Sequence, residues 1–234
     1  MVTLKHVTKA YKNRQVLKDF SYSFESGYIY GIIGSNGSGK STLLKMITGF
    51  ETPTSGEVYY LGKRLGTPHP DFSCVWQKPY LFQTDVYANI EYGLRVRKWD
   101  KKKRKERVEE MMEQFGVSHI QHQHARTLSG GEGARVAIAR AIAVYPRILI
   151  LDEPTASIDP NHVRVIEHAL VEINKKEKIT IILVTHNMFQ ARRIADITLY
   201  LQEGRLIEAG PTEQIFLTPK HRETKGFISG ELAL

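Results

Sequence analysis

The eight residues from Gly34 to Ser41, GSNGSGKS, constrain the fold of this chain more than any other stretch. They fit the pattern G-x-x-x-x-G-K-[ST], which is typical of a loop that binds nucleotide phosphates. The run before them, at 28–33, is apolar and rich in β-forming residues, and the run after them carries Leu43 and Ile47 at helical spacing. The segment is therefore predicted to join a strand to a helix, which is the context that this pattern requires.

The chemistry of this loop follows from its placement. Its glycines let backbone N–H groups converge on phosphate oxygens, and the N-terminus of the following helix adds a partial positive charge. Lys40 is then expected to reach the β- and γ-phosphates, and the Ser41 hydroxyl to be a ligand of Mg²⁺. The residues predicted to contact the nucleotide here are Gly34, Ser35, Asn36, Gly37, Ser38, Gly39, Lys40, Ser41 and Thr42.

The composition bounds the class of protein without deciding it. The 234 residues suit one domain with a lobe, and the single cysteine, Cys74, excludes an internal disulfide and a CxxC pair and fits a reducing compartment. No run reaches the roughly 18 uncharged apolar residues of a membrane span, and the N-terminus lacks the layout of a signal peptide. The net charge of +8 comes from 33 basic and 25 acidic residues spread along the chain, so charge alone does not indicate a nucleic acid or a lipid partner.

Two strands are predicted before the loop, over 2–9 and 15–24. Phe20, Tyr22 and Phe24 alternate as in a half-buried strand, so we expect an antiparallel β layer there. Tyr11 lies in the turn between the two strands rather than in the alternation. Its ring is either exposed enough to stack on a planar base, or it is an ordinary turn residue.

The middle of the chain is predicted to be polar and helical. Apolar residues recur at helical spacing over 103–115, where Gly116 ends the pattern, and the basic run at 101–105 is typical of a solvated helix face. Further along, Ser129, Gly130 and Gly131 precede a helical pattern at 134–144. We therefore expect these glycines at a helix N-terminus, as a second device that can bind an anion.

Two later strands are predicted to end in polar side chains. The run 147–151 is continuously apolar, which indicates a strand buried in a parallel sheet, and Asp152 and Glu153 follow it. A helix at 160–175 leads to a second apolar strand at 179–185, which is followed by His186. Ligands of open α/β sheets bind at the carboxyl ends of the strands, so these side chains are expected near the phosphate loop.

Taken together, these motifs resemble the ATPases of ATP-binding cassette (ABC) transporters, and the resemblance covers essentially the whole chain. The motifs that carry it are the phosphate loop, Gln77, the run from Leu128 to Glu132, the strand ending in Asp152-Glu153, Ser157-Ile158-Asp159 and His186. The resemblance implies an α/β fold in a single domain over 1–234. It comprises a RecA-like phosphate-loop core with an antiparallel β subdomain, over about 1–79 and 141–234, and an inserted helical subdomain at about 80–140.

The resemblance also implies ATP and Mg²⁺ as cofactors and gives the site residues their roles. By the family pattern Tyr11 stacks on adenine, and Asp152 holds Mg²⁺, partly through water. Gln77 senses the metal and the attacking water, Glu153 activates that water, and His186 contacts the γ-phosphate. These roles agree with phosphoryl transfer, which needs positioning and charge neutralisation more than covalent chemistry. The implied catalytic set is Lys40, Gln77, Glu153 and His186, and the implied Mg²⁺ ligands are Ser41, Gln77 and Asp152.

A head-to-tail homodimer is a further implication of the resemblance. In such a pair Ser129, Gly130 and Gly131 of one chain contact the nucleotide that the other chain holds. The sequence departs from the family pattern at Ser35, where proline is common, and at Glu132, which replaces the usual glutamine. A carboxylate suits a helix N-terminus but repels a γ-phosphate, so we expect Glu132 to point aside.

Within the family, a short cassette without a fused membrane part resembles the ATPase subunit of a bacterial or archaeal importer of a small solute. The stretches 77–82 and 86–94 resemble those of oxyanion importers, tungstate or molybdate before phosphate. The implied partners are integral membrane permease subunits and, indirectly, a substrate-binding protein, with no nucleic acid. The implied location is the cytoplasmic side of the cell membrane, as a peripheral subunit.

Four other classes of protein share the phosphate loop, and one of them, a small-molecule kinase, would lack the run from Leu128 to Glu132. The ATPase subunit of an ABC exporter shares all of these motifs. A DNA-maintenance ATPase of the SMC or Rad50 class needs a long coiled coil before the run 128–132, and no sustained heptads occur there. A GTPase would carry the motif N-K-x-D, to which only Asn174-Lys175-Lys176-Glu177 comes near.

Overall fold

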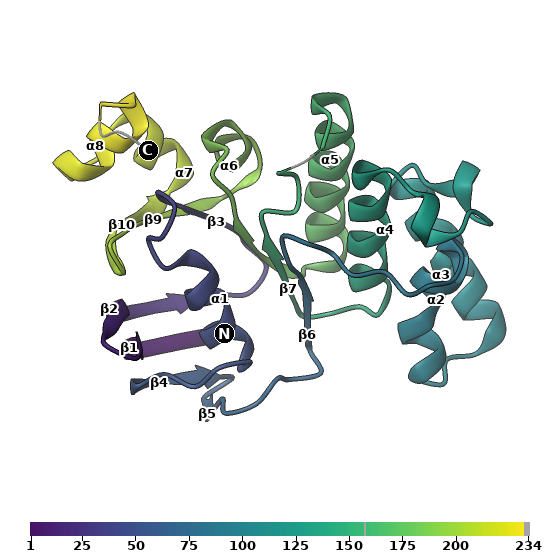
Figure 1. Ribbon diagram of the computed structural model, residues 1–234, viewed down its shortest axis with the longest axis horizontal. Helices are drawn as coiled ribbons and strands as arrows, with labels where there is room; N and C mark the ends of the chain where they lie inside the picture. The colour runs from purple at the N-terminus through teal and green to yellow at the C-terminus, as the bar shows by residue number, and fades with distance from the viewer. Residues whose placement is uncertain (157, 232–234) are drawn as a thin grey trace.

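The computed structural model describes residues 1–156 and 158–231 of the chain. Ser157, which belongs to one of the motifs above, lies outside the described residues. Two sheets occupy one side of the molecule and a group of helices extends from them at the other side (Figure 1).

The first sheet is antiparallel, with the strand order β2-β1-β4-β5, which confirms the β layer expected before the phosphate loop. Its alternating sequence buries Phe20 and Phe24 of β2, with Tyr22 half-buried between them. Leu17 is also buried although it is out of phase with Phe20, because the pairing of β1 with β2 changes register between Val7 and Lys9. Tyr11 is the last residue of β1 and pairs with Arg14 across a two-residue turn, so it belongs to the strand rather than to the turn. The strands are β1 (Val2–Tyr11), β2 (Arg14–Phe24), β4 (Ser55–Tyr60) and β5 (Lys63–Arg64).

The second sheet has the strand order β10-β9-β3-β8-β7-β6 and is parallel except for the pair β9 and β10. Every residue of β3, β7 and β8 is buried, as their continuous apolar sequences predict. Because β3, β6, β7 and β8 run in parallel, the segments that follow them emerge at one edge of the sheet. The strands are β3 (Ile29–Ile33), β6 (Phe72–Val75), β7 (Ile148–Asp152), β8 (Thr180–Val184), β9 (Ile197–Gln202) and β10 (Arg205–Pro211).

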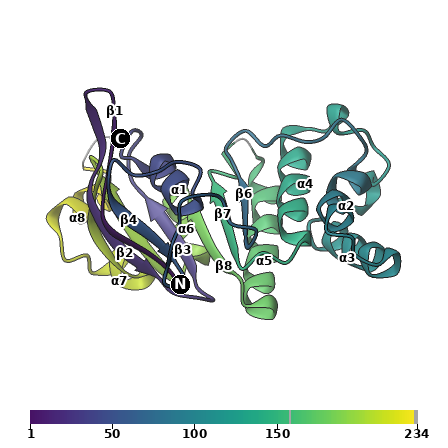
Figure 2. The ribbon, with the colours of Figure 1, turned by 90° about the horizontal axis from the view of Figure 1, so that it is seen from below.

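Two apolar cores lie on opposite faces of the parallel sheet, because successive side chains of a strand point to opposite faces. On β7, Ile148 and Ile150 pack with α1 and the antiparallel sheet, whereas Leu149 and Leu151 pack with α4 and α5. Figure 2 shows the antiparallel sheet and α1 on one side of β7, and α4 and α5 on the other. The helices are α1 (Lys40–Thr48), α2 (Val86–Val96), α3 (Lys101–Gln114), α4 (Gly130–Ala143), α5 (Pro160–Glu177), α6 (Met188–Ile194), α7 (Thr212–Leu217) and α8 (Arg222–Ser229), with short 3₁₀ turns at Ser118–Ile120 and Ala125–Thr127.

Helices α2, α3 and α4 pack on one another at the end of the molecule away from the antiparallel sheet (Figures 1 and 2). Arg107 of α3 is buried and ties this group to the core. Its guanidinium donates to the Glu177 carboxylate at the end of α5, at 2.7 Å, and to the backbone carbonyl of Ile142 at the end of α4, at 3.1 Å. The boundaries at about 80 and 140 between two lobes stay a prediction. Within the described residues, none of the helices combines the length and the apolar character that crossing a membrane would need.

Candidate functional site

The phosphate loop leaves the carboxyl end of β3 and enters α1, as its sequence predicts. Gly34 has a φ of 153°, and a Cβ there would lie 2.2 Å from the carbonyl oxygen of Leu201. Gly39 has a φ of 102°, and a Cβ there would lie 2.9 Å from the carbonyl oxygen of Val16. A side chain would clash at either position, so the path of the loop over the neighbouring backbone requires glycine at both.

Lys40 is folded back against this loop. Its Nζ donates to the carbonyl oxygens of Gly34 and Ser35, at 2.8 and 2.9 Å, and only 6% of the residue is exposed. Burial lowers the pKa of Lys40, and the nearby Glu153 and Asp152 carboxylates work against that shift. The loop therefore holds a desolvated cation at the N-terminus of α1. An anion that binds there is attracted more strongly than it would be by an exposed lysine.

Asp152, the last residue of β7, lies beneath the loop and is 7% exposed. Burial raises the pKa of this carboxyl, the neighbouring Glu153 carboxylate adds to the shift, and a hydrogen bond with Ser41 opposes it. The Lys40 and Lys45 ammonium groups oppose the shift as well, because a nearby cation favours the charged form of a carboxyl. Together with the Gln77 amide, the Asp152 carboxylate and the Ser41 hydroxyl offer oxygen donors, the type that Mg²⁺ prefers, so the residues present fit this ion.

Glu153 brings three of the predicted catalytic side chains together. Its Oε2 atom accepts a hydrogen bond from the Gln77 Nε2 atom at 3.1 Å and lies 3.2 Å from the His186 Nδ1 atom. Its backbone is left-handed, with a φ of 47°, and its N–H donates to the carbonyl oxygen of Val184 at 2.9 Å. A non-glycine residue in this conformation costs about 1 to 3 kcal/mol, so the contacts around Glu153 over-determine its position.

A cavity of about 810 Å³ joins the phosphate loop to the hairpin of β1 and β2. Tyr11 lies at one end of it, and Glu153 and His186 line it near the loop. Arg14, which no motif singled out, also lines it. Its Nη2 atom lies 4.0 Å from where a Cβ of Gly37 would stand. The cavity is lined by Tyr11, Arg14, Val16, Asn36, Gly37, Gly39, Lys40, Ser41, Thr42, Gln77, Glu153, Ala156 and His186.

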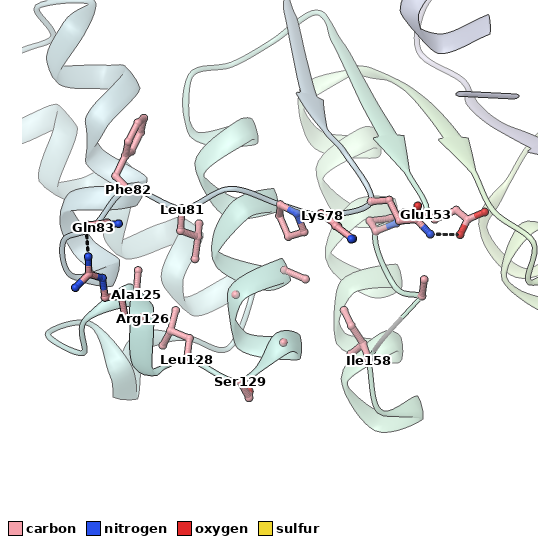
Figure 3. A pocket seen from close by; sticks show the side chains of 17 residues that line it. Lys78, Leu81, Phe82, Gln83, Ala125, Arg126, Leu128, Ser129, Glu153 and Ile158 are labelled. Atoms are coloured by element: carbon pink, nitrogen blue, oxygen red, sulfur yellow. Dashed lines mark hydrogen bonds between the residues drawn. The ribbon is translucent and has the colours of Figure 1, made fainter. Parts of the chain in front are cut away.

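Ser129 and Gly130, which were predicted to contact the nucleotide of a partner chain, lie at a different cavity. Ser129 and Gly130 line a second cavity of about 450 Å³, which Figure 3 shows between Gln83 and Arg126 at one end and Glu153 at the other. They do not line the cavity at the phosphate loop. Gln77 and Glu153 line both cavities. Within one chain, therefore, Lys40, Gln77, Glu153 and His186 line the cavity at the phosphate loop, whereas Ser129 shares only the second cavity with Gln77 and Glu153.

Ser129 caps the N-terminus of α4 together with Glu132. The Ser129 Oγ atom accepts a hydrogen bond from the Glu132 N–H at 3.3 Å, and the Glu132 Oε2 atom accepts from the Ser129 N–H at 2.8 Å and from its hydroxyl at 2.7 Å. These bonds from Ser129 lower the pKa of Glu132. The carboxylate thus does not point aside as expected, because the capping box draws it back onto Ser129.

Glu51 was also missed by the sequence reasoning. It follows α1, and its Oε2 atom accepts a hydrogen bond from the Tyr11 hydroxyl at 2.5 Å. It lies in a loop 40 residues from Tyr11, where nothing in the local sequence indicates a contact. Arg14 gives no signal either, since arginine is ordinary in an exposed hairpin.

Comparisons with known proteins agree with this geometry. Residues 17–156 match the family model described as ABC transporter. The chain is 44% identical over 208 residues to the tungstate uptake system ATP-binding protein TupC of Peptoclostridium acidaminophilum, covering 89% of this chain and 97% of that protein. It is 40% identical over 241 residues to the methionine import ATP-binding protein MetN of Clostridioides difficile (strain 630), covering 97% of this chain and 72% of that protein.

Two solved structures are similar over most of the chain. The structure of cbiO1 from Clostridium perfringens, described as part of the ABC transporter complex cbiONQ, has a TM-score of 0.84 at 30% identity and covers 93% of this chain and 90% of that one. A dimeric post-hydrolysis structure of the ATP-binding cassette MJ0796 bound to ADP and Pi has a TM-score of 0.81 at 30% identity and covers 91% of this chain and 99% of that one. The fold is therefore the RecA-like fold of these cassettes, and the chain belongs to the ABC transporter family as one of its ATP-hydrolysing ATP-binding subunits.

Proposed function

We propose that this subunit hydrolyses ATP in the cavity between Tyr11 and Glu153 and thereby powers the import of an inorganic oxyanion. The observation that carries the site is the position of Glu153. Its carboxylate lies at the end of a buried strand, faces the phosphate loop and contacts Gln77 and His186. A carboxylate held this way serves as a general base for a water molecule at the γ-phosphate, since geometry comes before basicity in such a role.

The other side chains of the site complete the proposal. Lys40 and the N–H groups of the loop bind the β- and γ-phosphates, and Tyr11 stacks on the adenine. Gln77 and His186 both orient the Glu153 carboxylate. In addition, Gln77 contacts the attacking water, and His186 contacts the γ-phosphate. Ser41, Gln77 and Asp152 would hold Mg²⁺, which neutralises phosphate charge when it is bound.

A second chain is part of this proposal. Ser129, Gly130 and Gly131 lie outside the phosphate cavity of their own chain, and the similar cassette MJ0796 forms dimers. We therefore propose a head-to-tail homodimer in which these residues contact the nucleotide of the partner chain. Permease subunits in the membrane and, through them, a substrate-binding protein complete the transporter, with this chain on the cytoplasmic side of the membrane.

The relatives of this chain differ in the solute that they import. The tungstate relative supports an oxyanion, since it is 44% identical across 97% of its own length. The methionine relative, at 40% identity, supports import of a small solute but a different one. Transport specificity resides in other subunits, so the solute does not follow from the residues of the ATP site.

One experiment tests both parts of the proposal. The chain is reconstituted in vesicles with the permease subunits that copurify with it and with their substrate-binding protein, and uptake of tungstate, molybdate, phosphate and methionine is measured with ATP. We expect ATP-dependent uptake of tungstate or molybdate, and none with Glu153→Gln, which keeps the shape and binds ATP but loses the base. Hydrolysis by Glu153→Gln at the wild-type rate would remove Glu153 from the mechanism. Uptake of methionine alone would refute the oxyanion and leave the ATP site intact.

A further inference from the structure

The Glu51 carboxylate contacts three donor groups next to Tyr11, at the end of the phosphate cavity where the adenine is proposed to bind. Glu51 lies just beyond α1, and its Oε2 atom accepts the hydrogen bond from the Tyr11 hydroxyl at 2.5 Å. Lys45 of α1 donates to its Oε1 atom at 3.1 Å, and the Nζ atom of Lys9 lies 3.3 Å from its Oε2 atom. The Glu51 N–H also donates to the carbonyl oxygen of Lys45, at 3.2 Å, so the loop that carries the carboxylate is itself tied to α1.

The Tyr11 ring needs such an anchor. It stands at the tip of the hairpin and is 38% exposed, so packing alone does not fix its rotamer. The ammonium of Lys9 lies over one face of the ring, 5.1 Å from its centroid, and Tyr11 also lines the cavity at the phosphate loop. The hydroxyl bond to Glu51 then fixes the direction of the ring, because a tyrosine has only two side-chain torsions.

The bond is of the strong kind, because its acceptor is charged. The Tyr11 hydroxyl, and after it Lys45 and Lys9, hold the pKa of Glu51 down to about 2. Hydrogen bonds to a charged acceptor are roughly twice as strong as neutral ones. Since α1 also begins at the phosphate loop, Glu51 connects the ring at one end of the cavity to the helix that holds the phosphates at the other.

We propose that Glu51 is a positioning residue for the nucleotide base, holding the Tyr11 ring at a fixed place relative to the phosphate loop. This inference rests on the proposed stacking of Tyr11 on adenine. The affinity for ATP then depends on Glu51, although its carboxylate does not touch ATP. The affinity for a triphosphate without a base does not depend on Glu51.

The test compares two ligands and four variants. Equilibrium binding of ATP and of inorganic tripolyphosphate is measured by calorimetry for Glu51→Ala, Tyr11→Phe, the double variant and Tyr11→Ala. We expect Glu51→Ala and Tyr11→Phe each to bind ATP at least fivefold more weakly. The double variant should be no weaker than the weaker single variant, because both remove the same bond. Tripolyphosphate should bind to each variant as tightly as it binds to the wild type. The kcat of Glu51→Ala at saturating ATP should equal that of the wild type, because Glu51 does not touch the reacting groups.

A matched control lies in the same sheet. Glu57 accepts a hydrogen bond from the Tyr59 hydroxyl at 2.5 Å, away from the cavity, so Glu57→Ala should leave ATP binding unchanged.

Tyr11→Phe keeps the ring and the fold, so it still tests the inference if Glu51→Ala unfolds the loop. An equal loss of ATP and tripolyphosphate affinity in the two single variants would overturn the inference. If Tyr11→Ala weakens ATP binding while Tyr11→Phe and Glu51→Ala do not, the inference alone fails. If Tyr11→Ala binds ATP normally, the stacking role fails and takes the inference with it.

Discussion

Lys40 shows how single residues of this site are prepared for an anion. Its ammonium is buried and donates to two carbonyl oxygens of its own loop, which are weak partners for a full charge. Burial lowers its pKa, and the nearby Glu153 and Asp152 carboxylates offset only part of that shift. A phosphate would supply further negative charge in a place that water reaches poorly, where the attraction is larger than at a surface.

We expect Lys40→Ala to reduce the ATPase rate by tenfold or more. The reason is that a hydrogen bond to a charged group is worth about 1.5 to 3 kcal/mol, and here it acts on the transferred phosphate. Steady-state hydrolysis at saturating ATP measures the effect. Lys63→Ala is the control, since this lysine is exposed on β5, outside the cavity. A rate for Lys40→Ala within about threefold of the wild type would exclude the role of Lys40 as a phosphate ligand in the reaction.

Helix α4 shows how an element end carries chemistry. The Ser129 hydroxyl is both acceptor and donor in the capping box, so its proton already points at the Glu132 carboxylate. The lowered pKa of Glu132 keeps that carboxylate charged at neutral pH. A γ-phosphate that approached Ser129 from a partner chain would therefore meet a negative charge beside the helix N-terminus, which opposes the favourable helix dipole.

Replacing the charge while keeping the cap separates these two effects. In Glu132→Gln the amide oxygen can still accept from Ser129, so the thermal midpoint should stay within about two degrees of the wild type. The ATP concentration for half-maximal hydrolysis should fall about threefold, because the repulsion of a nearby charge at an exposed site is worth about 0.3 to 1 kcal/mol. Glu132→Ala loses the bonds from Ser129 to the carboxylate but keeps the bond from the backbone N–H of residue 132 to Ser129, so it should be about 0.3 to 1.5 kcal/mol less stable. A half-maximal concentration that rises in Glu132→Gln would contradict the repulsion.

The elements themselves were largely predictable, and the contacts between them were not. The apolar run at 147–151 identified β7 as a buried parallel strand, because only a strand covered on both faces reads as continuously apolar. Strand β6 gave no such signal, since it is four residues long and only Val75 of it is buried. The order of the six strands likewise depends on long-range pairing, for which a single sequence offers no period to count.

The candidate site divides in the same way. The phosphate loop was predictable from local sequence, because its glycines are required where the backbone passes Leu201 and Val16. Gln77 and His186 look like ordinary polar residues by themselves, and their place in the order of motifs singled them out. The contact of Glu51 with Tyr11 could not be found, because it depends on where the loop after α1 returns to the hairpin.

At the scale of the whole molecule, the described part of the chain places the N-termini of α1 and α4, which can each bind an anion, at different cavities, and the cavity at α1 suits a triphosphate. Helix α1 begins at the phosphate cavity, whereas α4 begins at the second cavity, which Ser129 and Gly130 line and Lys40 does not. A triphosphate needs one cradle, so the N-terminus of α4 must serve another phosphate or the far side of the same one. In a pair with two-fold symmetry each chain lends the N-terminus of its α4 to its partner, and two sites form together.

This arrangement predicts complementation between two inactive chains. A Lys40→Ala chain and a Ser129→Arg chain are each expected to be inactive alone. Each homodimer has two composite sites, and its substitution damages both of them. In a mixed dimer one site carries both lesions and the other carries neither, so ATPase activity should return on mixing, toward half of the wild-type activity per dimer if one intact site turns over. Mixing Lys40→Ala with Glu153→Gln is the control. These two lesions lie on the same side of the composite site, so neither site of that mixed dimer is intact and no activity should return. Efficient hydrolysis by Ser129→Arg alone, at a concentration where light scattering shows monomers, would mean that one chain suffices and that α4 has no part in the partner's site.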